Sequence, residues 1–222
     1  MRNLKLDRAV YILLAVSAAL SILIYKFKEP AALDASALFE IFSKVVTVDT
    51  LLVTVFVKYF WKFRVFRGWL VLVPNLTGTW KGEIRSTWED PKTGQRFDPI
   101  PAILTIKQSL FHLSCVMRTE EMTSSSYSAG FVLDEDNQKS EICYSYNSLP
   151  NQVVIERSPQ HLGTALLEID EKPKKTLCGH YWSARKTTGD LEFDFWKKER
   201  LKCFPDHLRK KHPVSLNRDY KD

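Results

Sequence analysis

The sequence predicts two membrane-spanning helices followed by an all-β domain that closes into an eight-stranded antiparallel barrel. Two long apolar runs lie within the first seventy residues. After Pro74 the spacing of apolar residues changes from a helical period to a period of two, and eight short runs rich in β-branched and aromatic residues follow. The connections between these runs are too short for a crossover helix, so neighbouring antiparallel strands are expected.

The first apolar run, Ala9–Tyr25, has 17 residues and no charge. At 1.5 Å per residue it covers about 26 Å, the short end of the range for a bilayer span. A signal peptide is the alternative, because basic residues precede the run, but no convincing small-residue cleavage site follows it. The second apolar run begins so soon afterwards that we favour a membrane span.

The second run extends over residues 38–60, and its most apolar part is Val45–Val57. A short linker containing Pro30 joins it to the first run, which predicts a helical hairpin within residues 1–70, with spans at about 9–25 and 38–60. Basic residues precede and follow the hairpin, whereas those in the linker are opposed by acids. The positive-inside rule therefore places both termini and the β domain in the cytoplasm.

Asp49 is unusual for a membrane span, since an acid at the centre of one costs about 2.5–3.5 kcal/mol on insertion scales. One interpretation is that Asp49 lies at a shallow depth or is neutralised by Lys44. The other is that it faces a helix or subunit interface, where Asp49 and Lys44 provide the polar contacts of a membrane assembly.

Turn-forming residues such as Asp90-Pro91 and Thr188-Gly189-Asp190 separate the predicted strands. Eight antiparallel strands in sequential order can close into an up-and-down, lipocalin-like barrel, which removes the open edges of the sheet. A β-sandwich of the same strands is the alternative. The predicted strands are residues 76–87, 102–107, 111–118, 126–133, 141–147, 164–170, 177–185 and 191–197, with 153–157 as a possible ninth.

Two of these strands indicate which face is internal. Apolar residues alternate with acids in the last one: Leu191, Phe193 and Phe195 on one face, and Asp190, Glu192 and Asp194 on the other. The first strand alternates small and large residues on one face, which suits the inner wall of a small barrel: Gly78, Trp80, Gly82 and Ile84. Gly78–Trp80 also resembles the G-x-W that opens lipocalin barrels.

The net charge of +6 is unevenly distributed. Residues 75–196 hold 13 basic and 17 acidic residues, whereas residues 197–222 hold 9 basic and 4 acidic ones. We therefore divide the cytoplasmic part into a barrel domain, 75–198, and a basic C-terminal tail, 199–222. The tail is expected to be solvated or attracted to an anionic membrane surface.

Motifs for catalysis or cofactor binding are absent from the sequence. It has no phosphate-binding glycine loop, no G-x-S-x-G, no H-E-x-x-H and no C-x-x-C, and its five histidines are scattered. The four cysteines are expected to be reduced thiols in the cytoplasm. These observations favour a membrane-anchored binding module without enzymatic activity, metal or cofactor.

The motifs at the two ends of the barrel domain carry a family resemblance. TGTWKGEI (Thr77–Ile84) opens the domain and LCGHYWSARKTTGDLEF (Leu177–Phe193) closes it. With two spans and one cytoplasmic eight-stranded domain, nearly the whole chain resembles the two-transmembrane, β-strand-rich effectors of CBASS, a bacterial antiphage defence associated with CD-NTase nucleotidyltransferases.

The resemblance implies a function. A CD-NTase makes a cyclic dinucleotide during phage infection, the barrel binds it and oligomerises, and the clustered transmembrane segments disrupt the inner membrane and kill the cell. The implied partners are the cyclic dinucleotide as activating ligand, the CD-NTase, the bilayer and further copies of the chain, with no DNA or RNA polymer. The implied location is the bacterial inner membrane, which the chain crosses twice.

A cyclic dinucleotide needs Arg or Lys donors for two phosphates and aromatic faces for two bases. The acidic barrel leaves open where the phosphates are held, and Arg185 has the alternative of extending from a strand end into water. The candidate ligand residues, chosen by chemistry and position, are Arg85, Trp88, Arg118, Tyr144, Tyr146, Arg157, Tyr181 and Arg185.

Two other functions are compatible with this architecture: a constitutive carrier of an apolar ligand and a scaffold without a ligand. The lining of the barrel distinguishes receptor from carrier. Converging Arg and Tyr side chains favour a nucleotide, and a dry cavity of Leu and Phe favours a lipid.

Overall fold

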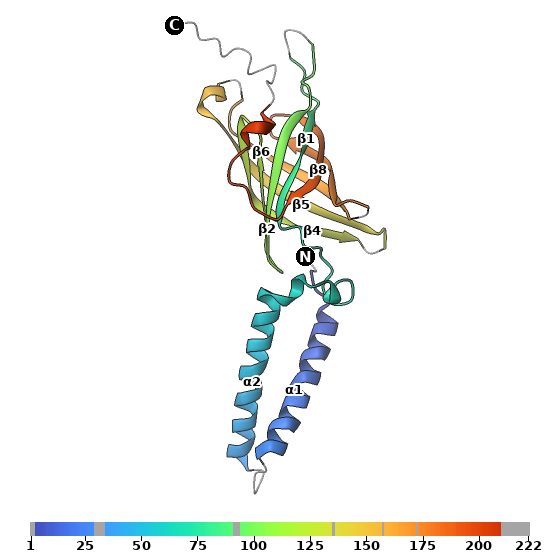
Figure 1. Cartoon of the computed structure of the whole chain (residues 1–222), viewed down its shortest axis with the longest axis vertical. Helices are drawn as coiled ribbons and strands as arrows, with labels where there is room; N and C mark the ends of the chain where they lie inside the picture. Colours follow the sequence, from blue (N-terminus) through green and yellow to red (C-terminus); the bar gives the residue numbers. More distant parts are fainter. Residues whose placement is uncertain are drawn as a thin grey trace. The chain divides into compact units, whose positions relative to one another are not determined.

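A computed structural model describes residues 3–28, 34–90, 94–134, 136–156, 158–171 and 173–209 (Figure 1). The chain forms two compact units, Arg2–Asn75 and Leu76–Asp222. The first is helical and the second consists mainly of β-strands, as the sequence predicts.

The helical unit contains α1 (Leu6–Lys28) and α2 (Ala35–Lys58), followed by the 3₁₀ helices η1 (Phe60–Lys62) and η2 (Arg64–Phe66). Within the described residues, one segment, Leu6–Phe27 of α1, is long and apolar enough to cross a membrane. The charges of Glu40, Lys44 and Asp49 lie on α2, which does not meet the same criterion.

A polar pair joins the two helices. Ser17 Oγ of α1 donates a hydrogen bond to Asp49 Oδ2 of α2 at 2.6 Å. Lys44 instead forms an ion pair with Glu40 at 2.8 Å, which argues against the interpretation that Lys44 neutralises Asp49. The second carboxylate oxygen, Asp49 Oδ1, is buried without a hydrogen-bond partner among the described residues.

The β unit is a closed barrel in which each strand pairs with the next and β8 pairs with β1. This pairing confirms the up-and-down barrel and excludes the sandwich. The strands are β1 (Gly78–Ser86), β2 (Ile100–Gln108), β3 (Leu113–Arg118), β4 (Met122–Asp134), β5 (Lys139–Pro150), β6 (His161–Asp170), β7 (Thr176–Ser183) and β8 (Thr188–Lys197).

The bounds of several strands differ from the predicted ones: β6 and β8 each begin three residues earlier, and β7 ends at Ser183, before Arg185. The possible ninth strand is not present among the described residues of 153–157, since Gln152–Val154 is a 3₁₀ helix, η3. Both β4 and β5 extend further toward one rim than predicted. The sequence there is rich in serine, and the buried hydroxyls of Ser124 and Ser148 share a hydrogen bond of 2.8 Å, which satisfies two polar groups inside the barrel.

The core fills the end of the barrel where β1 begins. Trp80 is fully buried, donates from Nε1 to Leu76 O at 3.0 Å and meets Phe195 edge to face at 5.2 Å between ring centroids. Leu191 and Phe193 are buried while Asp190 and Glu192 are exposed, which confirms the internal face predicted for the last strand.

Candidate ligand-binding site

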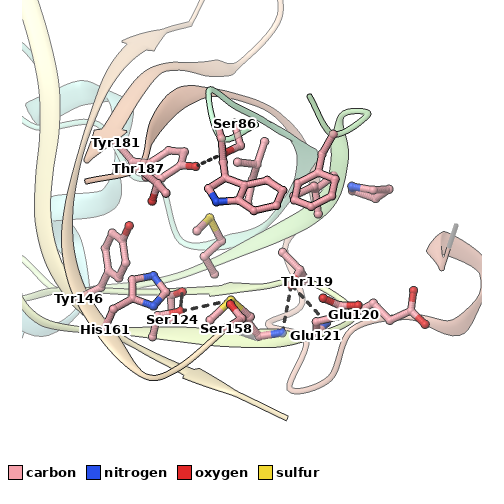
Figure 2. A pocket seen from close by; sticks show the side chains of 18 of the residues that line it. Ser86, Thr119, Glu120, Glu121, Ser124, Tyr146, Ser158, His161, Tyr181 and Thr187 are labelled. Carbon is pink, nitrogen blue, oxygen red and sulfur yellow. Dashed lines mark hydrogen bonds between the residues drawn. The ribbon is translucent and has the colours of Figure 1, made fainter. Parts of the chain in front are cut away.

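A cavity of about 390 Å³ lies at the opposite rim of the barrel, where β1, β3, β5 and β7 end (Figure 2). Its apolar lining includes Ile84, Ile100, Met117, Met122, Phe204 and Leu208. Its polar lining includes Ser86, Thr119, Glu120, Glu121, Ser124, Tyr146, Ser148, Ser158, His161, Tyr181, Arg185 and Thr187.

Two tyrosines of the cavity owe their positions to glycines on neighbouring strands. Tyr146 lies opposite Gly163 in the β5–β6 ladder, and Tyr181 lies opposite Gly189 in the β7–β8 ladder. A Cβ at Gly163 would lie 2.5 Å from the Tyr146 ring, and one at Gly189 would lie 2.7 Å from the Tyr181 ring. Glycine therefore leaves the space that each ring occupies across the neighbouring strand.

Hydrogen bonds hold the polar side chains around the cavity. Tyr181 donates from its hydroxyl to Ser86 Oγ at 3.1 Å, a contact visible in Figure 2. Arg185 lies in the turn between β7 and β8 and donates from Nη1 to Ser158 Oγ at 2.8 Å. The guanidinium of Arg185 is thus held at the rim by a neutral partner, with donors left for a ligand.

The protonation states of the lining follow from burial. Burial raises the pKa of Tyr146 and of Tyr181, so both hydroxyls remain protonated donors. Burial, together with the nearby Arg185, lowers the pKa of His161, which favours its neutral form. Burial also lowers the pKa of Arg185, but an arginine stays charged at neutral pH. Arg185 is therefore the cation among the described lining residues, against the carboxylates of Glu120 and Glu121.

An aromatic pair stands in the connection between β1 and β2. Trp88 and Phe97 both line the cavity, and their rings stack at 4.5 Å between centroids with an interplanar angle of 13°. Beside them, Arg96 and Glu89 form an ion pair at 2.9 Å that ties the two arms of the connection together. The mouth of the cavity thus offers aromatic surface, which suits a planar base.

The structure brings four of the eight candidate ligand residues together around the cavity: Trp88, Tyr146, Tyr181 and Arg185. Tyr144 lies on the same inner face of β5 as Tyr146 but is fully covered in the core. Arg157 falls outside the described residues.

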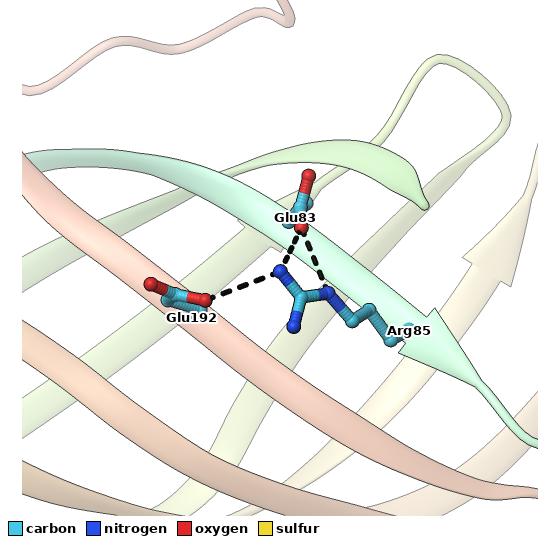
Figure 3. Close-up of polar contacts among 3 residues, drawn as sticks. All are labelled: Glu83, Arg85 and Glu192. Atoms are coloured by element: carbon cyan, nitrogen blue, oxygen red, sulfur yellow. Dashed lines mark hydrogen bonds and ion pairs between the residues drawn. The ribbon is translucent and has the colours of Figure 1, made fainter. Parts of the chain in front are cut away.

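Arg85 and Arg118 lie on the outer wall of the barrel. Arg85 is exposed and forms ion pairs with Glu83 at 2.6 Å and Glu192 at 3.4 Å (Figure 3). The hydrogen bond and charge of Glu83 raise the pKa of Arg85. Arg118 is half-buried, and its Nη1 lies 3.5 Å from Leu201 O. The alternation of side chains along the strand already predicts the outward position of Arg85, because Arg85 falls on the face opposite Trp80 and Ile84.

Sequence reasoning missed several lining residues. Ser86 and Ser148 follow inner-face positions by the period of two, and that period could have identified them. Phe97 could have been paired with Trp88 as the second aromatic residue of one connection. Phe204 and Leu208 lie beyond the last strand in a charged segment without periodicity, and no local pattern identifies them as lining residues.

Comparison with known proteins relates this barrel to a family. The model of the Cap15 cyclic dinucleotide receptor domain matches residues 71–194, more than half of the chain. CD-NTase-associated protein 15 of Staphylococcus schleiferi is 26% identical over 152 residues, covering 68% of this chain and 77% of that protein. The matched region contains β1 to β7, most of β8 and nearly the entire cavity lining. The chain therefore belongs to the Cap15 family of CD-NTase-associated proteins, the CBASS effectors with a cyclic dinucleotide receptor domain.

Proposed function

We propose that this chain is a membrane-anchored CBASS effector that binds one cyclic dinucleotide in the cavity at the open rim of its barrel. The observation that carries the proposal is the convergence of Arg185, Tyr146 and Tyr181 on a single cavity within the matched domain. A volume of about 390 Å³ is in the range of small-molecule sites in proteins.

The parts of the ligand match different parts of the lining. A phosphate accepts hydrogen bonds from Arg185 and from a neutral hydroxyl donor such as Tyr146. A base stacks on the aromatic pair of Trp88 and Phe97, an interaction worth roughly 1–3 kcal/mol in single-strand systems. Since the barrel is acidic overall, affinity depends on these directed contacts and falls as salt screens the guanidinium.

We propose further that ligand binding drives oligomerisation and clusters the membrane helices. In this proposal α2 is the second span of a hairpin whose termini lie in the cytoplasm. The Ser17–Asp49 hydrogen bond pairs the two helices, and Asp49 Oδ1 finds further polar partners in a cluster of hairpins. A cluster of polar faces admits water and ions, which disrupts the inner membrane.

Ligand binding is tested by calorimetry of the full chain in detergent. The probes are cyclic di-GMP, cyclic di-AMP and 3′,3′-cyclic GMP–AMP, each at low and high salt. We expect at least one to bind, with affinity that falls as salt rises. Silence toward all three, together with tight binding of a fatty acid, would replace the receptor by an apolar-ligand carrier.

The membrane step is tested in cells that coexpress a CD-NTase. Cells with the full chain are expected to lose membrane integrity, measured by uptake of an impermeant dye, and cells with residues 75–222 alone to survive. If the hairpin-free barrel kills equally well, toxicity does not arise at the membrane.

A further inference from the structure

The chain continues beyond β8 as a strap, residues 198–209, that runs back along the outside of the barrel (Figure 1, red segment ending at η4, Asp206–Leu208). Thr79 of β1 anchors its start, since Thr79 Oγ1 donates to Glu199 O at 2.6 Å and accepts from Leu201 N at 3.0 Å. Thr105 of β2 donates to Leu201 O at 3.2 Å. The strap therefore lies across β1 and β2.

Burial on the outer wall also indicates this path. Ile103 pairs with Lys81 and Arg118 in the ladders, and strand alternation points its side chain out of the barrel. Lys81 is exposed, yet Ile103, Thr79 and Thr105 are buried. The hydrogen bonds of Glu199 and Leu201 to Thr79 and Thr105 place the start of the strap at this face.

The second half of the strap reaches the ligand cavity. Phe204 and Leu208 belong to the cavity lining. Among the described residues, the backbone of segment 202–209 forms hydrogen bonds only within the segment. Leu208 N donates to Pro205 O and Arg209 N donates to Asp206 O, both at 3.1 Å. Outside the cavity, His207 meets Trp196 at 5.9 Å between ring centroids. Among the described residues, this half therefore has no backbone hydrogen bond to the barrel, whereas Thr79 and Thr105 anchor the first half.

We propose that the strap is a ligand-responsive wall of the cavity: anchored at Thr79, it closes Phe204 and Leu208 onto the bound ligand. The inference rests on the proposed function and concerns a segment beyond the end of the family match at residue 194. The ligand gains apolar contact with the strap, and by linkage the strap is held more firmly when the cavity is occupied.

Substitutions in the strap test its contribution to ligand binding. The full chain in detergent is titrated with the tightest-binding of the three cyclic dinucleotides. Phe204→Ala and Leu208→Ala are each expected to weaken binding by roughly tenfold, because each loses apolar contact with the ligand. Phe111→Ala is the matched control, since Phe111 is exposed and lies outside the cavity lining. Its binding should equal that of the wild type.

Hydrogen exchange tests the coupling without altering the cavity. In the wild-type chain, the ligand is expected to slow amide exchange in residues 202–209. Thr79→Val preserves side-chain shape but removes both anchor bonds, so exchange in residues 199–209 should rise and binding should weaken roughly threefold or more.

The possible failures are distinct. If no cyclic dinucleotide binds the wild-type chain, the proposed function and the strap inference both fall. If one binds, but the folded Phe204→Ala and Leu208→Ala variants bind it equally well, the strap inference alone is overturned. Should those variants not fold, the wild-type exchange experiment decides: a bound ligand that leaves residues 202–209 unchanged overturns it.

Discussion

At the scale of single residues, the charge of the cavity depends on Arg185, the cation of its described lining. Ser158 accepts one of its hydrogen bonds, and Glu120 and Glu121 lie on the turn between β3 and β4. The affinity of this site for an anionic ligand depends strongly on Arg185, because Glu120 and Glu121 also line the cavity and no described lysine or second arginine does.

Arg185→Gln is therefore expected to weaken cyclic dinucleotide binding by about ten- to a hundredfold, as a charged hydrogen bond contributes roughly 1.5–3 kcal/mol. Arg85→Gln is the matched control, because Arg85 is paired with glutamates on the outer wall. Calorimetry on both variants measures the difference. Equal loss in the two would mean that long-range charge, not a contact, governs affinity.

Tyr144 differs from Tyr146 despite lying two positions away on the same strand face. Its hydroxyl is buried without a hydrogen-bond partner among the described residues, and burial raises its pKa well above the usual value. Tyr144→Phe removes a polar group that was desolvated without compensation. The variant should melt at the same or a higher temperature, with a free energy of unfolding up to about 1 kcal/mol greater than that of the wild type. It should bind ligand normally.

Tyr146→Phe serves as the companion change, since Tyr146 lines the cavity. It is expected to weaken ligand binding with little effect on melting. If Tyr144→Phe lowers affinity as much as Tyr146→Phe, the ligand penetrates deeper into the barrel than the cavity indicates.

At the scale of elements, the ladders position the cavity through pairs of a tyrosine and a glycine. Gly163→Ala would place a methyl group 2.5 Å from the Tyr146 ring and 2.8 Å from Trp182 O. We expect it to destabilise the barrel by roughly 1–3 kcal/mol in thermal melting and to weaken ligand binding, because the ring must move. Leu162→Ala, on the exposed face of β6, is the control and should do neither.

In the helical unit, the Ser17–Asp49 hydrogen bond joins α1 to α2. Asp49→Leu removes a carboxylate that one serine satisfies only in part. We expect weaker killing in the dye-uptake assay with unchanged ligand binding, because in the proposed mechanism the hairpins lose the polar group that favours clustering. Asp49→Asn, which keeps a hydrogen-bonding side chain, should retain part of the activity. Full killing by Asp49→Leu would exclude this residue from assembly.

The elements also explain which parts of the site could be predicted from the sequence. The alternation of Leu191 and Phe193 with acids reveals the inner face of β8, because a strand with one buried face repeats every two residues. The strap has no such repeat. Whether Phe204 is solvated or lines a cavity depends on where a charged segment lies on a barrel that is already closed. The pairing of Asp49 with Ser17 likewise depends on the packing of two helices, which neither helix encodes alone.

At the scale of the whole molecule, the barrel unit has its own core around Trp80 and Phe193. We predict that residues 75–222 fold without the helical unit, because a chain of this size can bury a sufficient core. Circular dichroism should show a β-sheet spectrum and a cooperative thermal transition. A random-coil spectrum would mean that the barrel needs the helices or the membrane to fold.

Closure between β8 and β1 limits how copies of this domain can associate. An open sheet has an edge to which another chain can add a strand, and such growth leads to cross-β fibrils that persist. In this barrel β1 and β8 hydrogen-bond to each other, so neither end strand offers an edge for strand addition. Among the described residues, β3 pairs with β4 only over Thr123–Ser125, so the edge of β4 beyond them is the part of the sheet that closure leaves unpaired. Copies that associate through side-chain contacts separate when the small molecule that favours the assembled state is diluted. We expect barrels assembled in that way to return to monomers after the ligand is degraded, so that any lasting damage to the cell would reside in the membrane.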